Sequence, residues 1–372
     1  MVLDNILMVD PLEGEFTGSL EIEDGKISKI SKKERTWSYI VIPGFFDPHV
    51  HGSYGVDTMD LSKKSLEKME EFFYSQGVTS FLPTTVSCSF ETMLKALDVI
   101  KEYLDEKNVT SIFGAHLEGP YISHEKMGAQ NPKYIREPNV INEIKTISEK
   151  SVLKLITMAP ELEGFSESAK ILISKKIVIS MGHSNAKFEH VKMAYDMGVR
   201  RITHFPNALR SLHHREIGIT GAGFYFDDIV LEIICDGVHL SPRMVELMYK
   251  IKGADNIILI TDAISAAGLK DGVYELGGLK VFVENNVARL SNGSLAGSTL
   301  TFINAVKNFQ KFTKASLKEL VRVSSYNAIQ DLSIDNLGRI KEGFIADLVV
   351  LDKDLNLMST IKEGKIVYRK KP

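Results

Sequence analysis

The sequence predicts an α/β fold class: a (β/α)8 TIM-like barrel with a small β-sandwich domain built from both chain ends. Through the middle of the chain, eight short apolar runs alternate with amphipathic helical stretches, which is typical of parallel strands covered by helices. Both ends instead alternate apolar and polar residues, as antiparallel strands with one buried face do. We expect the small β domain over residues 1–43 and 337–372 and the barrel over residues 44–336.

Eight strands favour a closed barrel over an open doubly wound sheet. The open sheet is the alternative fold, but no Gly-x-Gly-x-x-Gly motif follows the first expected strand to support it. The expected strands are Ile40–Phe46, Thr79–Val86, Ser111–Leu117, Val152–Met158, Ile177–Met181, Arg201–Phe205, Val230–Cys235 and Asn256–Thr261.

Several helix and turn boundaries can be assigned from single residues. Ser89 can cap a helix whose apolar residues recur at three- and four-residue spacing over 90–104. Another helix is expected over 66–73, and Ser316 and Glu319 have the spacing of a capping box. In the N-terminal part, Asp24-Gly25 between alternating runs predicts a tight hairpin, because glycine accepts the positive φ of a type I′ turn.

Length and composition describe an ordinary globular chain. The 372 residues suggest about two or three domains at ~150 residues each. Hydrophobic residues make up 44% and charged residues 25%, values that exclude a fibrous or disordered chain. The formal net charge of -3 favours neither nucleic acid nor an anionic membrane as a partner. Two cysteines, Cys88 and Cys235, are too few for a disulfide framework or a cysteine-rich zinc site.

The sequence also carries no visible targeting segment. Residues 1–11 lack a basic stretch followed by an apolar one, so we expect no signal peptide. No apolar run approaches the ~18 residues of a membrane-spanning helix. We therefore expect a cytoplasmic protein.

Polar side chains follow the expected strands where each strand ends, and in a barrel those ends form one face. His49-Val50-His51 follows the first strand. Residues two apart in an extended chain point to the same side, so both imidazoles could reach one metal ion. A pair of histidines in a surface loop is the alternative, but the preceding apolar strand favours the ligand interpretation.

Glu118, His183 and His204 follow three further strands. One glutamate and two histidines are a ligand set for an open catalytic metal site with room for water. Singly, each histidine could be a hydrogen-bonded core residue, and Glu118 could pair with an arginine at the barrel mouth; together the three positions favour a metal site. The fourth strand has no lysine at its end to bridge two metal ions, so we expect Glu118 to be the central ligand.

Three further features have candidate roles. Asp262 follows the last strand and could act as general base and later as acid, although capping a turn is the alternative. Arg215 lies in a loop after the sixth strand and suits an anionic substrate, although a solvated loop charge would also explain it. The small-residue turn over 295–299 precedes a helix, where an anion can bind.

Taken together, these motifs resemble the amidohydrolase superfamily and, within it, the N-acetylglucosamine-6-phosphate deacetylase family. The similarity extends along essentially the whole chain. The segments that carry it are His116-Leu117-Glu118-Gly119-Pro120-Tyr121, Gly182-His183-Ser184, Thr203-His204-Phe205-Pro206-Asn207-Ala208, Asp236-Gly237-Val238-His239, Thr261-Asp262-Ala263 and Leu295-Ala296-Gly297-Ser298-Thr299.

The resemblance implies hydrolysis of the acetamido group of N-acetylglucosamine 6-phosphate to glucosamine 6-phosphate and acetate, in amino-sugar catabolism or recycling. By analogy, Glu118, His183 and His204 bind a divalent metal ion, zinc or iron, and Asp262 activates the metal-bound water and then protonates the leaving amine. His49 and His51 could support a second ion, which gives one or two ions per subunit.

The resemblance also implies the substrate contacts and the assembly. Arg215 would hold the phosphate, and the family forms homodimers in which His239 could reach the neighbouring site. The implied substrate-binding residues are Ala129, Gln130, Asn207, Ala208, Arg215, Asp236, His239, Leu295, Ala296 and Gly297.

One position departs from the family pattern. After Gly128-Ala129 the family usually has histidine, thought to polarise the substrate carbonyl, whereas this chain has Gln130. Glutamine can donate a neutral hydrogen bond but cannot carry positive charge, so stabilisation of a developing oxyanion should weaken. We therefore expect the substitution Gln130→His to raise kcat.

Two other functions compete with this one. A different metal-dependent amidohydrolase, such as a cyclic-amide hydrolase or a deaminase, is disfavoured by the missing strand-four lysine and by Arg215 with His239. A non-catalytic scaffold of the same fold would not need a bound metal ion. It would also have no need to keep four residues together: Glu118, His183, His204 and Asp262.

Overall fold

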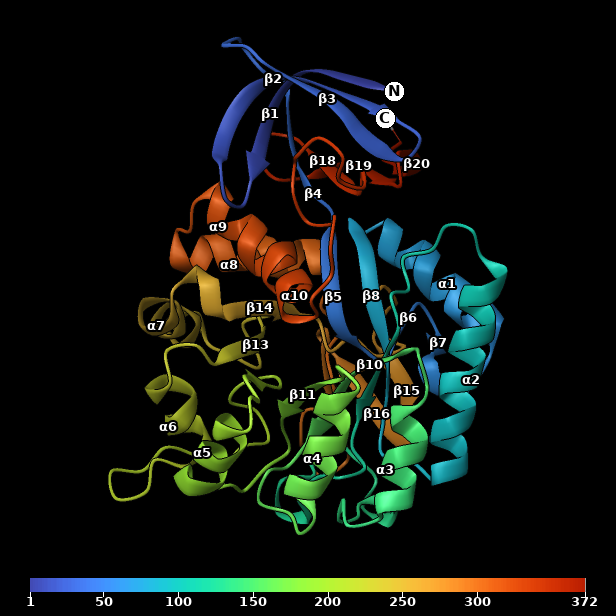
Figure 1. The fold of residues 1–372 in the computed structure, drawn as a ribbon, viewed down its shortest axis with the longest axis vertical. Helices are drawn as coiled ribbons and strands as arrows, with labels where there is room; N and C mark the ends of the chain where they lie inside the picture. Colours follow the sequence, from blue (N-terminus) through green and yellow to red (C-terminus); the bar gives the residue numbers. More distant parts are fainter. Residues whose placement is uncertain (372) are drawn as a thin grey trace.

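The computed structural model describes residues 1–371, which form a barrel with a small β domain above it (Figure 1). Eight parallel strands are hydrogen-bonded in the order β14-β13-β12-β11-β10-β9-β8-β5, so the predicted barrel is confirmed. The strands are β5 (Phe45–Val50), β8 (Val78–Thr85), β9 (Ala115–Glu118), β10 (Leu153–Met158), β11 (Val178–Met181), β12 (Arg201–Ile202), β13 (Val230–Ile234) and β14 (Ile257–Ile260).

The barrel closes just beyond the end of β14. The Asp262 backbone N–H donates to His49 O at 3.0 Å, and the His51 N–H donates to Ala263 O at 2.8 Å. Val50 and Ala263 form a parallel bridge between these two bonds. Closure therefore places Asp262 directly beside the His49–His51 pair.

The first expected strand, Ile40–Phe46, is divided in the structure. Its beginning belongs to β4 (Tyr39–Pro43) in the small domain, and its end begins β5 after Gly44. β5 then continues through Asp47 and His49, so His49 lies within the strand and not after it. These polar residues resemble a loop in the sequence, but they are buried because their side chains point into the barrel.

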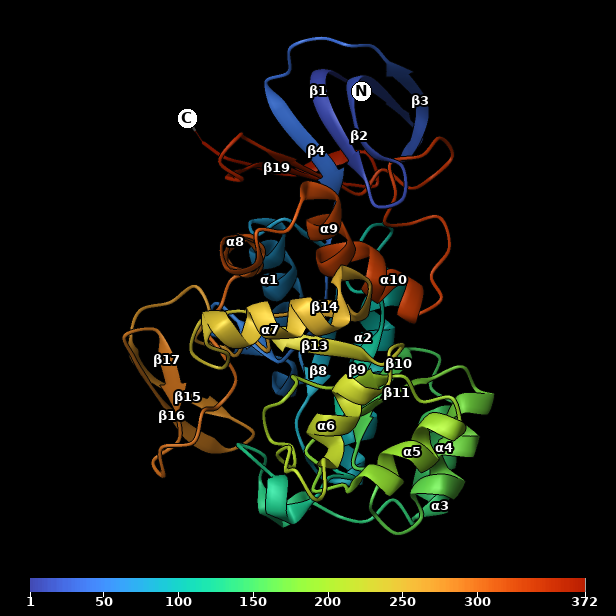
Figure 2. The same cartoon turned by 90° about the vertical axis from the view of Figure 1, so that its left-hand side faces the viewer.

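Helices cover the outside of the barrel (Figures 1 and 2). They are α1 (Lys63–Tyr74), α2 (Phe90–Glu106), α3 (Ile141–Ser148), α4 (Phe165–Ser174), α5 (Phe188–Asp196), α6 (Gly218–Tyr225), α7 (Pro242–Lys252), α8 (Phe302–Thr313), α9 (Leu317–Val321) and α10 (Asn327–Asp331). Shorter helical turns are η1 (Thr58–Asp60), η2 (His124–Lys126), η3 (Pro132–Tyr134), η4 (Ala254–Asn256) and η5 (Arg322–Tyr326), the last of which is a π turn.

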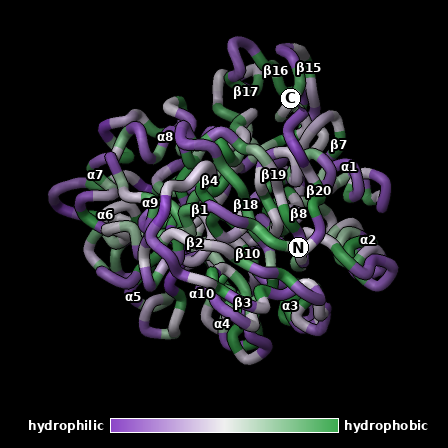
Figure 3. The backbone as a smooth tube through the Cα atoms, turned by 90° about the horizontal axis from the view of Figure 1, so that it is seen from above, coloured by the Kyte–Doolittle hydropathy of each residue, from purple (hydrophilic) through white to green (hydrophobic). Residues whose placement is uncertain are grey.

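The predicted helix starts are confirmed. Ser89 Oγ accepts the Thr92 backbone N–H at 3.2 Å at the start of α2. Ser316 and Glu319 form the predicted capping box at the start of α9. Such caps satisfy backbone N–H groups that a helix cannot pair internally. In a view from above, apolar segments concentrate toward the centre of the molecule and polar segments toward its rim (Figure 3).

Both chain ends contribute to one seven-stranded sheet of order β20-β19-β18-β4-β1-β2-β3, as predicted. The sheet curls until β3 meets the segment before β18, where the Ile27 N–H donates to Phe344 O at 2.9 Å. Met8, Leu20 and Leu348 bring the two halves into a common core. Its strands, besides β4, are β1 (Val2–Asp10), β2 (Gly14–Glu23), β3 (Lys26–Lys32), β18 (Leu348–Leu351), β19 (Leu357–Lys362) and β20 (Lys365–Arg369).

Two further pieces of sheet lie outside the sequence-based prediction. A three-stranded antiparallel sheet follows β14, to one side of the barrel in Figure 2. It contains β15 (Gly272–Leu276), β16 (Leu279–Glu284) and β17 (Val287–Arg289). The short pair β6 (Gly52–Ser53) and β7 (Val56–Asp57) follows β5. Within residues 1–371, no helix is long and apolar enough to cross a membrane.

Asp57, at the end of β7, makes the stability of the fold depend on pH. Burial raises the pKa of its carboxyl to about 6. The unfolded chain ionises at lower pH, so the folded state loses stability as the pH rises through this window, and the full loss is present at neutral pH. A shift of one pKa unit corresponds to about 1.36 kcal/mol. We therefore expect Asp57→Asn to raise the free energy of unfolding by up to about 3 kcal/mol near pH 7 and to change it little near pH 4. Chemical unfolding at both pH values checks this; an equal effect at both would contradict it.

Candidate active site

Six polar side chains meet at the carboxyl ends of the barrel strands. His49 belongs to β5 and His51 follows it, and Glu118 is the last residue of β9. His183, His204 and Asp262 come two residues after the ends of β11, β12 and β14. All six residues are at most 8% exposed. The expected convergence of these side chains on one face of the barrel is therefore observed.

The Glu118 carboxylate lies between two pairs of histidines. Its Oε1 is 3.2 Å from His183 Nε2 and 3.1 Å from His204 Nε2. The other pair also faces it: His49 Nε2 lies 3.3 Å from Oε1 and His51 Nε2 lies 3.3 Å from Oε2. Ligand-type atoms gather in two groups of three, His49–His51–Glu118 and Glu118–His183–His204. Glu118 is common to both, which fits a central ligand.

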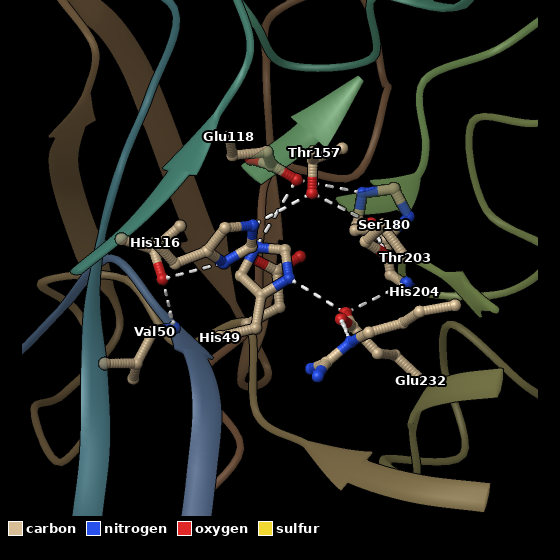
Figure 4. A network of polar contacts seen from close by, with 12 residues as sticks. His49, Val50, His116, Glu118, Thr157, Ser180, Thr203, His204 and Glu232 are labelled. Atoms are coloured by element: carbon tan, nitrogen blue, oxygen red, sulfur yellow. Dashed lines mark hydrogen bonds and ion pairs between the residues drawn. The ribbon is translucent and has the colours of Figure 1, made fainter. Parts of the chain in front are cut away.

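Each of these four histidines is oriented by its second ring nitrogen. Nδ1 of His51 lies 3.2 Å from Thr84 O, Nδ1 of His183 lies 2.8 Å from Lys126 O, and Nδ1 of His204 lies 3.1 Å from Asn207 O. Nδ1 of His49 lies 3.2 Å from the Glu232 carboxylate (Figure 4). A carbonyl or carboxylate accepts a hydrogen bond, so Nδ1 carries the proton in each ring. Nε2 is therefore the nitrogen that faces the common centre in each ring, as in histidine metal ligands.

The residues present suit a divalent cation. Among the described residues His49 Nε2 is buried without a hydrogen-bond partner, although an unpaired buried nitrogen is costly. Burial opposes protonation of His51, but hydrogen bonding to Asp262 and Glu118 raises its pKa to about 9. Burial likewise opposes protonation of His49, yet Glu118 and Asp262 raise its pKa well above the ordinary value. The site thus favours positive charge, and nitrogen and carboxylate ligands are those that zinc or iron can use.

His116 lies beneath this centre but is not directed at it (Figure 4). Its Nε2 is 2.9 Å from Thr157 Oγ1 and its Nδ1 is 3.3 Å from Thr84 Oγ1. Burial lowers its pKa well below the ordinary value, so the ring is neutral. It is therefore a hydrogen-bonded core histidine. Lys154 on β10 donates to Ser151 O at 3.0 Å and is not part of the site, consistent with the expected absence of a bridging lysine.

Three of these residues have an unusual backbone. The φ values of His183, His204 and Asp262 are 47°, 30° and 49°. A positive φ is uncommon outside glycine, and such strain clusters at functional sites. This conformation turns the chain sharply just past the strand, and all three side chains lie at the common centre.

Asp262 lies against the His49–His51 pair. Its Oδ1 is 3.1 Å from His51 Nε2 and 3.5 Å from His49 Nε2. Burial would raise the pKa of this carboxyl, but the two histidines lower it, so the group is an ionised acceptor. Its side chain is 11% exposed, and it lines the adjoining cavity. An ionised carboxylate in this place can accept a proton from a molecule in the cavity.

A cavity of about 350 Å³ opens beside the centre. It is lined by His51, Glu118, His183, His204 and Asp262 on one side. Of the predicted substrate-binding residues, the cavity wall contains Ala129, Gln130, Asn207, Ala208, His239, Leu295 and Gly297. Its volume is in the range of pockets that hold small molecules.

The other three predicted contacts lie outside this cavity. Arg215 is exposed on its loop, with its guanidinium 2.8 Å from His214 Nε2. Asp236 binds His239 Nδ1 at 2.6 Å, so it orients a wall residue without lining the wall. Ala296 is fully buried in the small apolar cluster beneath the 295–297 segment. Within this chain, the structure therefore does not bring these three side chains to the cavity.

The turn over 295–299 supports Asp262 rather than beginning a helix. The Ser298 N–H donates to Asp262 O at 2.7 Å, and α8 begins later, at Phe302. Gly297 has a φ of +55°, and a Cβ there would lie 2.8 Å from Asp262 O. Only glycine permits this close approach. The apolar helix expected after this turn is therefore present, but Leu300 and Thr301 separate it from the turn.

Gln130 contacts Glu118. Its Nε2 donates to Glu118 Oε2 at 2.5 Å, and its Oε1 accepts the Ser87 backbone N–H at 2.7 Å. We expect Gln130→His to raise kcat, because histidine can carry positive charge toward the cavity. It should also lower stability by about 1–3 kcal/mol, because the buried Ser87 N–H loses its acceptor. Steady-state kinetics and chemical unfolding test the two effects separately. A kcat that stays level or falls would mean that Gln130 is not a weaker substitute for histidine.

Sequence reasoning missed several residues of the site. Glu125, Lys126, Ile234, Leu276 and Ser294 also line the cavity. Glu232, which holds His49, could have been suspected, because a charged residue within the apolar run Val230-Leu231-Glu232-Ile233-Ile234 must find a partner. Leu276 could not, because it comes from β15 in the sheet that the sequence analysis did not predict.

Known proteins resemble this chain over nearly its full length. A model of the amidohydrolase family matches residues 40–367. An N-acetylglucosamine-6-phosphate deacetylase of Lysinibacillus sphaericus is 38% identical over 98% of this chain and 97% of its own. An N-acetylgalactosamine-6-phosphate deacetylase of Escherichia coli O157:H7 is 34% identical over 93% of this chain and 94% of its own. The crystal structure of N-acetylglucosamine-6-phosphate deacetylase from Thermotoga maritima is 54% identical, covers 100% of both chains and has a TM-score of 0.96.

Proposed function

Because the chain belongs to the amidohydrolase family, we propose that it hydrolyses the acetamido group of N-acetylglucosamine 6-phosphate, giving glucosamine 6-phosphate and acetate. One observation carries this proposal. Glu118 lies between two histidine pairs, with Asp262 beside them, at the wall of a cavity of about 350 Å³. This arrangement has the ligands and the proton acceptor that amide hydrolysis requires.

His49, His51, Glu118, His183 and His204 would hold one or two divalent ions, zinc or iron. When bound, such an ion would polarise the acetamido carbonyl and lower the pKa of a water molecule beside it. The Nδ1 hydrogen bonds of the histidines keep their lone pairs directed at this place. The scaffold alternative has no use for this ligand set.

Asp262 would transfer the proton. Its ionised carboxylate accepts the proton from the attacking water and returns it to the amine as the carbon–nitrogen bond breaks. The turn over 295–298 fixes its backbone through the Ser298 N–H and the bare Cα of Gly297. A fixed carboxylate can serve both steps without moving far.

The cavity walls would recognise the sugar and its phosphate. Ala129, Asn207, Ala208, Leu295 and Gly297 would contact the sugar. His239, which Asp236 holds at the cavity wall, would meet the phosphate in the cavity of its own chain. Arg215 would hold the phosphate only if its exposed loop moves or if a second subunit presents it, as in the homodimer that we propose.

A second substrate is favoured by the names of two relatives. The Escherichia coli O157:H7 relative is named for N-acetylgalactosamine 6-phosphate, which differs from the glucosamine compound at one hydroxyl group. Acetate release should therefore be measured from both phosphorylated sugars and from unphosphorylated N-acetylglucosamine, each with and without a chelator. We expect chelator-sensitive release from N-acetylglucosamine 6-phosphate and little from the unphosphorylated sugar. Faster release from N-acetylgalactosamine 6-phosphate would make that compound the preferred substrate. No acetate release from any of the three sugars after metal addition would refute the deacetylase proposal.

A further inference from the structure

A chain of buried charged groups runs from the active site into the barrel. Glu232 Oε2 lies 3.2 Å from His49 Nδ1, and Glu232 Oε1 accepts a hydrogen bond from Arg201 Nε at 2.6 Å. Arg201 NH1 pairs in turn with Asp331, the last residue of α10. The side chains of His49, Glu232 and Arg201 are all 0% exposed, and that of Asp331 is 11% exposed. We propose that these linked charged groups position His49: Glu232 sets the orientation of the His49 ring and so the affinity of the site for a metal ion.

Stability alone does not account for these charges. Removing an arginine and two carboxylates from water is expensive, and buried ion pairs often contribute no more than well-packed apolar residues would. Arg201 also has one nitrogen, NH2, that is buried without a hydrogen-bond partner among residues 1–371. Apolar side chains such as Phe46, Leu155 and Ile258 form a buried cluster in the barrel, and Ile258 on β14 pairs with Glu232 on β13. Apolar residues therefore pack beside these charged groups, and the charges need an explanation other than packing.

Glu232 differs from the acceptors of the other three histidines. His51, His183 and His204 each direct Nδ1 at a backbone carbonyl, whereas His49 directs it at a carboxylate. A negatively charged acceptor makes an imidazole a stronger electron-pair donor than a neutral carbonyl does. Glu232 Oε2 also lies 3.4 Å from the backbone N of His204, so one carboxylate touches residues of both ligand groups.

Each of these charged groups fixes the position of its neighbour. Arg201 occupies one oxygen of Glu232 and leaves the other for His49. Asp331 holds the far end of Arg201, at the edge of a cavity of about 1180 Å³ formed around the first residues of the barrel strands. This arrangement fixes the carboxylate, and through it the ring plane and tautomer of His49, before any ion binds.

The test is zinc binding, measured by competition with a chromophoric chelator on the full chain after its own metal has been removed. This inference rests on the proposed ligand set but not on the proposed substrate. We expect Glu232→Gln to weaken the binding of at least one zinc ion by about 10–100-fold, the usual effect of removing a partner of a ligand. Asp331→Asn should act in the same direction by a smaller factor, and it provides the test if Glu232→Gln fails to fold.

Glu70→Gln is the matched control. Glu70 is a buried carboxylate on α1 that accepts hydrogen bonds from Tyr103 Oη and Ser111 Oγ, far from the histidines in the fold. It should lower stability without changing zinc affinity. Zinc binding by Glu232→Gln within twofold of the unsubstituted chain, or an equal loss in Glu70→Gln, would overturn the positioning role. A chain that binds zinc normally but releases no acetate would refute the proposed function and leave this inference standing.

Discussion

Replacing Asp262 with asparagine should lower kcat by about 10²–10⁴-fold, the usual contribution of a general acid–base group. Asparagine has nearly the same shape and keeps a polar side chain beside His51, whose Nε2 lies 3.1 Å from Asp262 Oδ1. It cannot take up a proton at neutral pH. KM, metal content and the unfolding midpoint should therefore stay close to those of the unsubstituted chain. Steady-state kinetics together with elemental analysis of the purified variant measure all of these properties.

The control is Asp10→Asn, the same chemical change at a buried carboxylate of the small β domain. Asp10 binds the Arg339 guanidinium and the Ile340 N–H, so its loss should lower stability but not kcat. If Asp262→Asn instead loses its metal, Asp262 is chiefly a ligand. The general-base role would then belong to another group. The experiment can distinguish the two roles because Asp262 Oδ1 lies within 3.5 Å of both His49 Nε2 and His51 Nε2, close enough to share an ion with them.

Replacing Glu118 with glutamine should remove metal from both histidine groups. Glu118 is the one residue common to them, and all four histidine Nε2 atoms lie 3.1–3.3 Å from its oxygens. Activity should fall by about 10³-fold or more, because a metal ion supplies several kcal/mol of charge stabilisation and each 1.36 kcal/mol is tenfold in rate. Elemental analysis and acetate release on the same preparation measure both losses.

His204→Gln separates the two groups. It should lower metal content and activity together but leave the His49–His51 group able to bind, so its metal loss should be smaller than that of Glu118→Gln. The half-buried His190, whose Nδ1 accepts the Lys187 N–H at 3.2 Å, offers a His→Gln control without effect on metal. Activity that survives in His204→Gln with full metal content would remove His204 from the ligand set.

Much of the site could be predicted because local rules and topology agree. The apolar runs before Glu118, His183, His204 and Asp262 predict strands, and parallel barrel strands bring their carboxyl ends to one face. The convergence of these residues therefore needs no knowledge of long-range contacts. The small β domain was predictable for a similar reason, since the alternation of residues and the Asp24-Gly25 turn are local signals. Both residues of that turn do have positive φ, 48° and 76°.

Other features depend on contacts between distant segments, which one sequence does not specify. Gln130 was expected to face the substrate, yet the fold also brings its amide 2.5 Å from Glu118. Arg215 was assigned to the phosphate, yet its loop holds it outside the cavity of its own chain. The division of the first expected strand at Gly44 also followed from pairing, because β4 joins the small sheet while β5 joins the barrel.

The fold class, the ligand-type residues and their placement at strand ends can be derived from the amino-acid order, because periodicity and residue chemistry are local properties. The way in which those residues are held depends on contacts that form only in the folded protein. The linked charged groups Glu232, Arg201 and Asp331 join β13, β12 and α10. Arg201 is 31 residues from Glu232 and 130 residues from Asp331 in the sequence. Hydrogen bonds between such distant residues arise from the closed barrel. The orientation of His49, and with it the geometry offered to a metal ion, is therefore a property of the folded molecule.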